Sequence, residues 1–469
     1  MVIGREKEQK KLLSLLKSEE SQFVAVYGRR RVGKTYLVRQ TFQNRFTFDY
    51  SGVFNQKSKK QQSEFVEAIR AQGYKEAPKP KDWFDVFRSL SVLIDKSRMK
   101  KKVIFLDEIQ WMDNPRSSFL PAFEHFWNGW ASARKDVLLI ICGSASSWII
   151  NKVFKNRGGL YNRVNLQLGL NLFTLSECEQ YVKANGLNFS RDEILMAYMA
   201  IGGVPYYWSL LDKNLSVAQN IDELFFPQKG QLHNEFEALY YSMFSNPDPY
   251  IDVITVLGTK KCGMTRDELL KALKRKDDGS LTRMLENLLQ CDFIRKYHAF
   301  GKKAKGVLYQ LIDSYTLFYF KFIKGKNTDS VRWLKIIDTP QFYAWRGLAF
   351  EQVCLLHTEK LKEVIGIADV ACDVCSWQYK GDDDTPGTQI DLLLDRSDGV
   401  INLCEMKCTD GPFKIDKDYA MSMKERKRIF IEKTKTRKTV RTTMVTSGGL
   451  ADNQWSREIP NQIVADSLF

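Results

Sequence analysis

Residues 26–40, VYGRRRVGKTYLVRQ, decide the fold of the first part of this chain. The segment GRRRVGKT fits the pattern G-x-x-x-x-G-K-[ST], and it stands between an apolar, strand-like run and a helical pattern. Glycines let the backbone curl so that successive N–H groups point inward, and the following helix adds its positive N-terminal end. The stretch therefore predicts a cradle for a phosphate chain.

The side chains of this cradle have distinct expected roles. Lys34 should reach the β- and γ-phosphates of ATP, and the Thr35 hydroxyl should ligate Mg²⁺. The other expected nucleotide contacts come from the loop and the start of the helix: Gly28, Arg29, Arg30, Arg31, Val32, Gly33 and Tyr36. The alternative, a chance match in a turn, is disfavoured by the strand and helix patterns on either side.

A second segment, KKVIFLDEIQWM, supplies an acidic pair. Its apolar residues carry Asp107 to the C-terminal end of a predicted buried strand. Asp107 would hold the Mg²⁺ shell, and the adjacent Glu108 is placed to polarise an attacking water. Hydrolysis of the triphosphate is therefore the expected chemistry, with Lys34, Asp107 and Glu108 as catalytic residues.

Each of three further positions near this site has two possible interpretations. Ser144, at the end of the next predicted strand, either senses the γ-phosphate or caps a helix. Arg157 and Arg163 in NRGGLYNRV are candidates for an arginine that meets the charge of the transition state, and either could equally be a surface residue. We include Arg163 among the predicted catalytic residues.

The composition is that of a folded protein with several domains. The chain has 469 residues, of which 44% are hydrophobic and 27% are charged, and this length predicts two to four domains. Apolar runs such as residues 137–142 are much shorter than the ~20 residues that cross a bilayer. The N-terminus is charged where a secretory signal needs an apolar core. We therefore expect no membrane segment and a cytoplasmic location.

Charge and cysteine content favour a polyanionic partner and a reducing compartment. The formal net charge is +15, and Lys and Arg neutralise phosphates, although a basic run such as residues 424–441 is usually a solvated face. The nine cysteines are scattered and predict no disulfide framework. A zinc site of Cys372, Cys375, Cys404 and Cys408 is disfavoured, because the second pair lies on an apparent strand with three intervening residues.

Periodicity predicts four domains. Residues 1–170 alternate helical patterns with apolar strands, which predicts a parallel sheet covered by helices, and residues 171–245 would form a helical lid. Residues 246–326 contain three short amphipathic helices, with Thr265 as a plausible N-cap, and then a hairpin with a basic tip, which is the pattern of a winged helix. A polar joint near residues 327–331 leads to the last domain, 332–469.

The last domain contains a second acidic set, in TQIDLLLDRSDGVINLCEMKCTDG. Side chains alternate along a strand, so Glu405 and Lys407 should project to one face, with Asp391 on the preceding strand of the same hairpin. Two carboxylates can bind Mg²⁺, and a lysine can orient the water that attacks a phosphodiester. The alternative is a polar strand face with a surface ion pair.

The N-terminal motifs resemble a known family. IGRE, the phosphate cradle, FLDEIQWM, CGSASSWI, GGLYNRV and GGVPYYW occur in the order seen in prokaryotic AAA+-like ATPases related to the STAND class. The resemblance covers the first ~230 residues. It implies that Gly4 and Arg5 lie near the adenine of bound ATP.

The C-terminal set resembles the PD-(D/E)XK nuclease superfamily. This resemblance implies that Glu351, on the preceding helix, is an additional acid, so that Glu351, Asp391 and Glu405 would be metal ligands and Glu405 and Lys407 catalytic residues. The family pattern has a proline before the aspartate, and no proline precedes Asp391 here. AAA+-like ATPases of this kind often carry such a domain after a winged helix.

The combined prediction is an α/β P-loop NTPase core with a helical lid, a winged-helix region and a C-terminal restriction-endonuclease-like domain. It describes a Mg²⁺-dependent ATPase that acts on or near nucleic acid, with DNA favoured, and it is compatible with a homo-oligomer. Residues 282–290 would be the recognition helix, with Lys302, Lys303 and Lys305 at the wing. Two alternatives stay open: an ATP-dependent signalling switch and a DNA-binding regulator, each with a catalytically silent nuclease fold.

Overall fold

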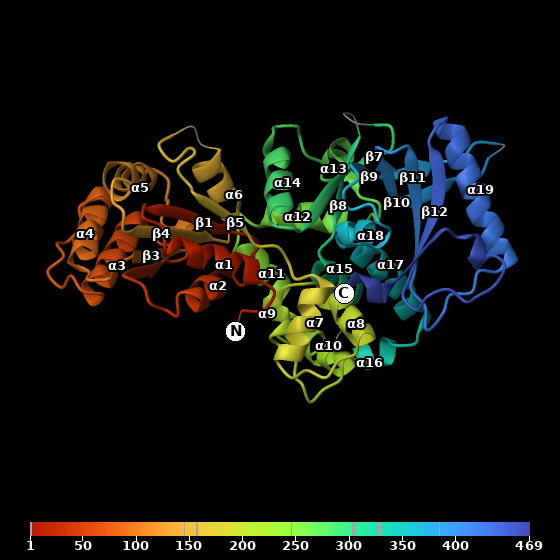
Figure 1. Ribbon diagram of the computed structural model, residues 1–469, viewed down its shortest axis with the longest axis horizontal. Helices are drawn as coiled ribbons and strands as arrows, with labels where there is room; N and C mark the ends of the chain where they lie inside the picture. Colours follow the sequence, from red (N-terminus) through yellow and green to blue (C-terminus); the bar gives the residue numbers. More distant parts are fainter. Residues whose placement is uncertain are drawn as a thin grey trace. The chain divides into compact units, whose positions relative to one another are not determined.

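The computed structural model describes residues 2–144, 146–155, 158–244, 246–302, 306–326, 331–383 and 385–469. The chain divides into two compact units, residues 1–172 and residues 173–469, and Figure 1 labels most of the helices and strands of both. None of the helices in these described ranges combines the length and the apolar character that a membrane span requires.

The first unit alternates strands and helices along the chain. Its strands are β1 (Gln22–Tyr27), β2 (Phe48–Ser51), β3 (Lys102–Asp107), β4 (Val137–Gly143) and β5 (Leu166–Gly169). Its helices are α1 (Glu6–Leu15), α2 (Lys34–Thr41), α3 (Ser58–Ala71), α4 (Trp83–Lys96), α5 (Phe119–Phe126) and α6 (Ser146–Ile149). The three predicted buried strands are confirmed as β1, β3 and β4.

These strands form one parallel sheet in the order β2-β3-β4-β1-β5, as the sequence predicts. Alternate strand residues face two separate cores. Phe23 and Ile104 pack on the side of α3, α4 and α5, whereas Val24 and Phe105 pack on the side of α1 and α2. A sheet that is covered on both faces leaves its carboxyl edge as the place where loops can bind a ligand.

The second unit begins with helices. These are α7 (Leu175–Ala184), α8 (Arg191–Ile201), α9 (Pro205–Trp208), α10 (Val217–Phe225) and α11 (Glu235–Tyr241). Capping boxes begin α7, α8 and α10, where Thr174, Ser190 and Ser216 each exchange hydrogen bonds with the third helical residue.

A smaller group of elements follows, which we call the three-helix segment. It consists of α12 (Asp248–Leu257), β6 (Met264–Thr265), α13 (Arg266–Ala272), α14 (Ser280–Gln290), β7 (Ile294–Ala299) and β8 (Val307–Leu311). The predicted cap of the second helix is confirmed, because the Thr265 side chain accepts from the Glu268 amide in a capping box. Lys302 is exposed at the hairpin tip, and Lys303 and Lys305 lie outside the described residues.

Among its described residues, the rest of the unit contains four α-helices and then a set of strands with one further long helix between two of them. The helices are α15 (Ser314–Phe322), α16 (Trp333–Ile336), α17 (Pro340–Leu356) and α18 (Thr358–Val364). The strands are β9 (Cys372–Tyr379), β10 (Thr388–Arg396), β11 (Val400–Lys407), β12 (Thr439–Thr446) and β13 (Asn461–Val464), with α19 (Lys417–Thr434) between β11 and β12. Residues 327–330, most of the predicted joint, lie outside the described residues.

One mixed sheet runs through the second unit in the order β13-β12-β11-β10-β9-β7-β8-β6. It joins the three-helix segment to the C-terminal strands, because His298 of β7 pairs in parallel with Cys375 of β9. The rings of Phe300 and Phe430 also lie 5.2 Å apart, next to the core that α19 forms on this sheet. Figure 1 shows α19 beside β12 of this sheet. The hairpin of the three-helix segment is therefore anchored to the C-terminal part.

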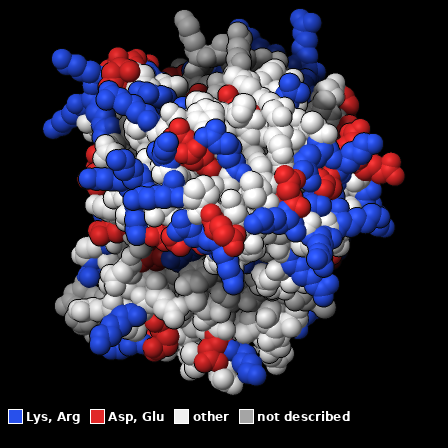
Figure 2. All heavy atoms as spheres, turned by 90° about the vertical axis from the view of Figure 1, so that its left-hand side faces the viewer, with Lys and Arg blue, Asp and Glu red and all other residues white. Residues whose placement is uncertain are grey.

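Basic side chains are abundant, but many are paired. On the face that Figure 2 shows, Lys and Arg are interspersed with Asp and Glu. The densest basic stretch of the sequence includes much of α19, where Arg428 pairs with Glu425 and Glu432, and Lys424 pairs with Glu458. These pairs neutralise part of the charge that the sequence offers to a polyanion.

Candidate nucleotide site and acidic centre

The predicted phosphate cradle lies between the end of β1 and the start of α2. Gly28 has φ +142°, and a Cβ added to it would collide with the carbonyl oxygen of Leu170. Arg31 and Gly33 have positive φ values of 73° and 86°, so the loop uses the left-handed conformations from which anion-binding backbone concavities are built. No atom lies within 4 Å of a Cβ built on Gly33, which leaves open space where α2 begins.

The side chains of the cradle divide into buried and accessible ones. Arg29 is fully buried and Val32 packs into the core on the α1 and α2 side, so these two can offer a ligand their backbone. Arg30 and Arg31 are half-buried, and Tyr36 is exposed on α2.

Lys34 is buried and held by the loop itself. Its Nζ donates to the carbonyl oxygens of Gly28 at 2.9 Å and Arg29 at 2.8 Å. Charge-assisted hydrogen bonds of this kind are the strong ones. The ammonium is therefore fixed above the curled backbone, at the position expected to meet a phosphate.

Thr35 and Asp107 are brought together across the edge of the sheet. Thr35 Oγ1 donates to Asp107 Oδ2 at 2.8 Å, although the two residues are far apart in sequence. Burial raises the pKa of Asp107, while the hydrogen bond from Thr35 acts in the opposite direction. A nearby cation stabilises the ionised form of a buried carboxylate. The Thr35 hydroxyl and the Asp107 carboxylate together supply the oxygen ligands that Mg²⁺ prefers.

Glu108 has a constrained backbone and two side-chain partners. Its φ is +47°, a left-handed conformation that is uncommon for residues other than glycine. Its Oε2 accepts from Ser144 Oγ at 2.8 Å and from Gln110 Nε2. Ser144 follows β4, which lies between β1 and β3, so sheet order brings this serine to the predicted catalytic acid.

Gln110 is a site residue that the sequence analysis missed. Its amide lies between Glu108 and Ser144, donating to both, and it is buried. The available signal was a glutamine two positions after Glu108. A single polar residue in a turn does not indicate which carboxylate its side chain will contact.

The remaining predicted nucleotide residues lie at the N-terminus and before β5. Gly4 has φ +67°, and Arg5 is buried and donates to the carbonyl oxygen of Asn171 at 2.5 Å. Arg163 is exposed in the loop that leads to β5, and Arg157 lies outside the described residues.

The C-terminal acidic residues come from α17, β10 and β11. Glu405 and Lys407 share one face of β11, as predicted, with Nζ and Oε1 3.3 Å apart. Asp391 lies where the pairing of β9 with β10 shifts register between Ile390 and Leu393, an irregularity of the kind that re-aims side chains. Glu351 projects from α17 in the same unit.

Each of these acids is paired with a cation of the chain. Lys261 Nζ lies 2.5 Å from Glu351 Oε2 and 3.2 Å from Asp391 Oδ2. Glu405 accepts from Arg426 and, at 2.8 Å, from the Tyr419 hydroxyl. Within the described ranges, no three acidic, histidine or cysteine side chains form a group that could hold a metal ion. The structure therefore does not assemble the predicted C-terminal metal ligands into one group.

Part of the chain matches a known family model. Residues 3–211 match a family model that describes an ATPase domain found predominantly in Archaea. The first part of the chain is therefore similar to an archaeal-type P-loop ATPase domain, and the loop after β1 lies within the matched range.

Individual relatives can then be named. An uncharacterized protein of Methanocaldococcus jannaschii is 25% identical over 429 residues, which is 87% of this chain and 88% of that protein. Among solved structures, the Walker-type ATPase of Pyrococcus abyssi is 18% identical with a TM-score of 0.46, covering 67% of this chain and 95% of that one. The ORC2 protein of Aeropyrum pernix is 12% identical with a TM-score of 0.42, covering 76% of this chain and 96% of that one.

Proposed function

We propose that this chain binds and hydrolyses ATP with Mg²⁺ at the carboxyl edge of the sheet in the first unit. The observation that carries the proposal is the 2.8 Å hydrogen bond between Thr35 and Asp107, because it places two ligands of the type that Mg²⁺ prefers beside the phosphate loop. Bound there, Mg²⁺ would neutralise charge on the phosphates.

The residues of the chain then take separate tasks. The amides of the loop and the ammonium of Lys34 bind the phosphates, and Glu108 orients and polarises the attacking water. Ser144 and Gln110 hold the Glu108 carboxylate through the hydrogen bonds that they donate to it. Gly4 and Arg5 are proposed for the base side, and Arg163 for the transition-state charge.

Two variants test this proposal by separating binding from turnover. Lys34→Ala should abolish the heat of ATP binding in calorimetry with MgATP. Glu108→Gln should keep binding but lower turnover by about 10²–10⁴-fold, the usual contribution of a general base. Glu19→Gln is the matched control, since Glu19 is exposed before β1, at the opposite end of that strand from the loop. Unchanged binding in Lys34→Ala, or full turnover in Glu108→Gln, would refute it.

We further propose that the chain after residue 170 combines a helical lid (171–245), a winged helix (246–326) and a PD-(D/E)XK-like domain (332–469). The winged helix is supported by the element order of the three-helix segment, helix, strand, two helices and hairpin. The nuclease-like domain is supported by the helix α17 before β9–β11 and by the α19 crossover into parallel β12.

DNA is the proposed partner, and α14 the proposed recognition helix. Its buried residues include Leu281 and Leu288, whereas Arg283 and Glu286 are exposed. Arg283→Ala should weaken binding of duplex DNA in a fluorescence anisotropy titration, with Arg88→Ala on α4 of the other unit as the control. Loss of a phosphate contact should also reduce the salt slope of binding by about one.

The ion pairs of the acidic centre favour a second candidate, an ATP-dependent switch whose nuclease fold is silent. As arranged, Glu351, Asp391 and Glu405 face Lys261 and Arg426 and do not fit a metal ion. Incubating plasmid DNA with Mn²⁺ and comparing wild type with Glu405→Ala separates the two candidates. Identical products for both proteins would show that the centre does not cleave DNA in its present arrangement and would favour the switch.

A further inference from the structure

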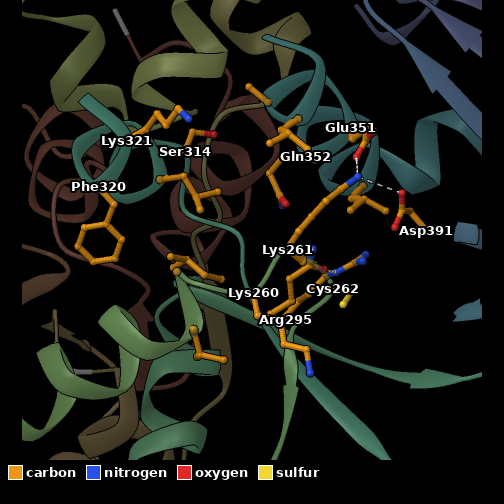
Figure 3. Close-up of a pocket in the computed structure, with 18 of the residues that line it drawn as sticks. Lys260, Lys261, Cys262, Arg295, Ser314, Phe320, Lys321, Glu351, Gln352 and Asp391 are labelled. Atoms are coloured by element: carbon orange, nitrogen blue, oxygen red, sulfur yellow. Dashed lines mark hydrogen bonds and ion pairs between the residues drawn. The ribbon is translucent and has the colours of Figure 1, made fainter. Parts of the chain in front are cut away.

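Lys261 connects the three-helix segment to two of the C-terminal acids. It lies in the turn between α12 and β6, and its side chain extends to Glu351 on α17 and Asp391 on β10 (Figure 3). The sequence separation of Lys261 and Asp391 is 130 residues. One lysine thus bridges two carboxylates that come from two other elements.

The backbone that carries Lys261 is held firmly by the neighbouring hairpin. The Lys261 carbonyl accepts from Gln310 Nε2 at 2.7 Å, and the Cys262 carbonyl accepts from the Tyr297 hydroxyl at 2.5 Å. Gly263 ends the turn with φ +71°, and a Cβ there would collide with the Tyr309 carbonyl. The position of Lys261 is therefore determined by β7 and β8.

The positive charge of Lys261 and the negative charges of Glu351 and Asp391 stabilise one another. Burial by itself would lower the pKa of Lys261, but the carboxylates of Asp391 and Glu351 raise it above its usual value. Burial raises the pKa of Glu351, and Lys261 opposes that change. Without the ammonium, two partly buried carboxylates would face each other and would favour another cation in its place.

The bridge lines a cavity, which gives the lysine room to leave. The cavity has a volume of about 360 Å³ and is lined by Lys261, Glu351 and Asp391 together with Arg295, Gln352 and Phe320. Figure 3 shows Lys261 crossing from the turn towards the acids. The Lys261 side chain is 43% exposed, so a change of side-chain rotamer needs no rearrangement of a packed core.

We propose that Lys261 is an internal lock: its ammonium takes the place between Glu351 and Asp391 that a divalent cation would occupy, so the centre binds metal only after Lys261 withdraws. The inference rests on the proposed assignment of residues 332–469 as a nuclease-like domain. It explains why the acids are brought near one another without forming a metal group. Because the lysine side chain can leave by a change of rotamer, a ligand that draws its ammonium away would open the centre.

Mn²⁺ binding to the full-length chain tests the lock. All proteins carry Asp107→Asn to remove the proposed site of the first unit, and Mn²⁺ alone is titrated and followed by electron paramagnetic resonance. Lys261→Met and Lys261→Gln should each bind one Mn²⁺ at least about tenfold more tightly than the protein with Lys261, since both remove a cation that competes for the same oxygens. Adding Asp391→Asn to Lys261→Met should abolish this gain.

Lys260→Met is the matched control. Lys260 belongs to the same turn but pairs with Glu268 of α13 at 2.7 Å, so its removal should leave Mn²⁺ binding unchanged. Equal affinity in the Lys261 variants and their parent would overturn the lock, and so would an equal gain in Lys260→Met. Plasmid cleavage by Lys261→Met is scored separately: tighter Mn²⁺ binding without cleavage would keep the lock and reject the nuclease activity.

Discussion

Replacing Asp107 by Asn should stabilise the nucleotide-free chain while it removes metal-dependent ATP binding. Asp107 is 6% exposed, and burial raises the pKa of its carboxyl group despite the hydrogen bond from Thr35. The negative charge therefore costs folding free energy at neutral pH. An amide of the same size removes that charge and keeps one oxygen as an acceptor.

The expected magnitude follows from two opposing contributions. Each tenfold rise in the proton affinity of the buried carboxylate corresponds to about 1.4 kcal/mol that Asn recovers. Against this, Asp107 accepts from Thr35 Oγ1 at 2.8 Å and from the Glu108 amide at 3.0 Å, and losing one such bond costs about 1 kcal/mol. We expect a net gain in stability, and each 1 kcal/mol of gain would raise the melting temperature of a unit of this size by about 2–4 °C.

The pH dependence identifies the cause. A group whose pKa is raised by folding stabilises the folded state fully below its unfolded pKa, and this stability is lost as the pH rises through the folded pKa. The unfolded pKa of Asp107 is near 3.8. The advantage of Asn should therefore be largest near neutral pH and shrink as the pH falls towards 4. A constant difference would point to packing instead of charge.

Calorimetry and amide hydrogen exchange together measure this effect. Calorimetry of the full chain without nucleotide gives the shift, and exchange of the amides in β1 and β3 assigns it to the first unit. Asp113→Asn is the control, because Asp113 is half-buried and accepts from Trp148 Nε1 at 2.9 Å, so it should show no gain. A lower melting temperature for Asp107→Asn at pH 7, or an ATP-induced shift with Mg²⁺ equal to that of wild type, would refute the reasoning.

Three further substitutions test two glycine positions of the backbone and one buried hydrogen bond between helices. Gly28→Ala would place a Cβ against the Leu170 carbonyl at φ +142° and should cost about 2–3 kcal/mol and abolish nucleotide binding, measured by thermal denaturation with and without MgATP. Gly203→Ala, whose Cβ would collide with the Phe173 carbonyl, should destabilise the second unit by a similar amount in a urea titration. Asp222→Ala removes a buried acceptor of the Trp333 amide at 2.6 Å and should cost about 1–3 kcal/mol, seen as faster exchange of that amide.

The local structure around the loop after β1 could be predicted, because its signals lie within a few residues of one another. Gly28 and Gly33 set the loop conformation, Lys34 and Thr35 begin the next helix, and a buried apolar strand delivers Asp107 and Glu108 to the same edge of the sheet. The partners Gln110 and Asn171 were not predictable, since each contact depends on where a neighbouring turn ends.

The sequence by itself determined the central strands of the first unit and the carboxylate-bearing positions, because hydrophobic periodicity and glycine geometry act over a few residues. Only the tertiary structure decided what those carboxylates meet. Pairing of β7 with β9 joins the hairpin to the C-terminal sheet, and this brings Lys261 to Glu351 and Asp391. Contacts over such separations arise from strand order and packing, which leave no periodic signal near the lysine.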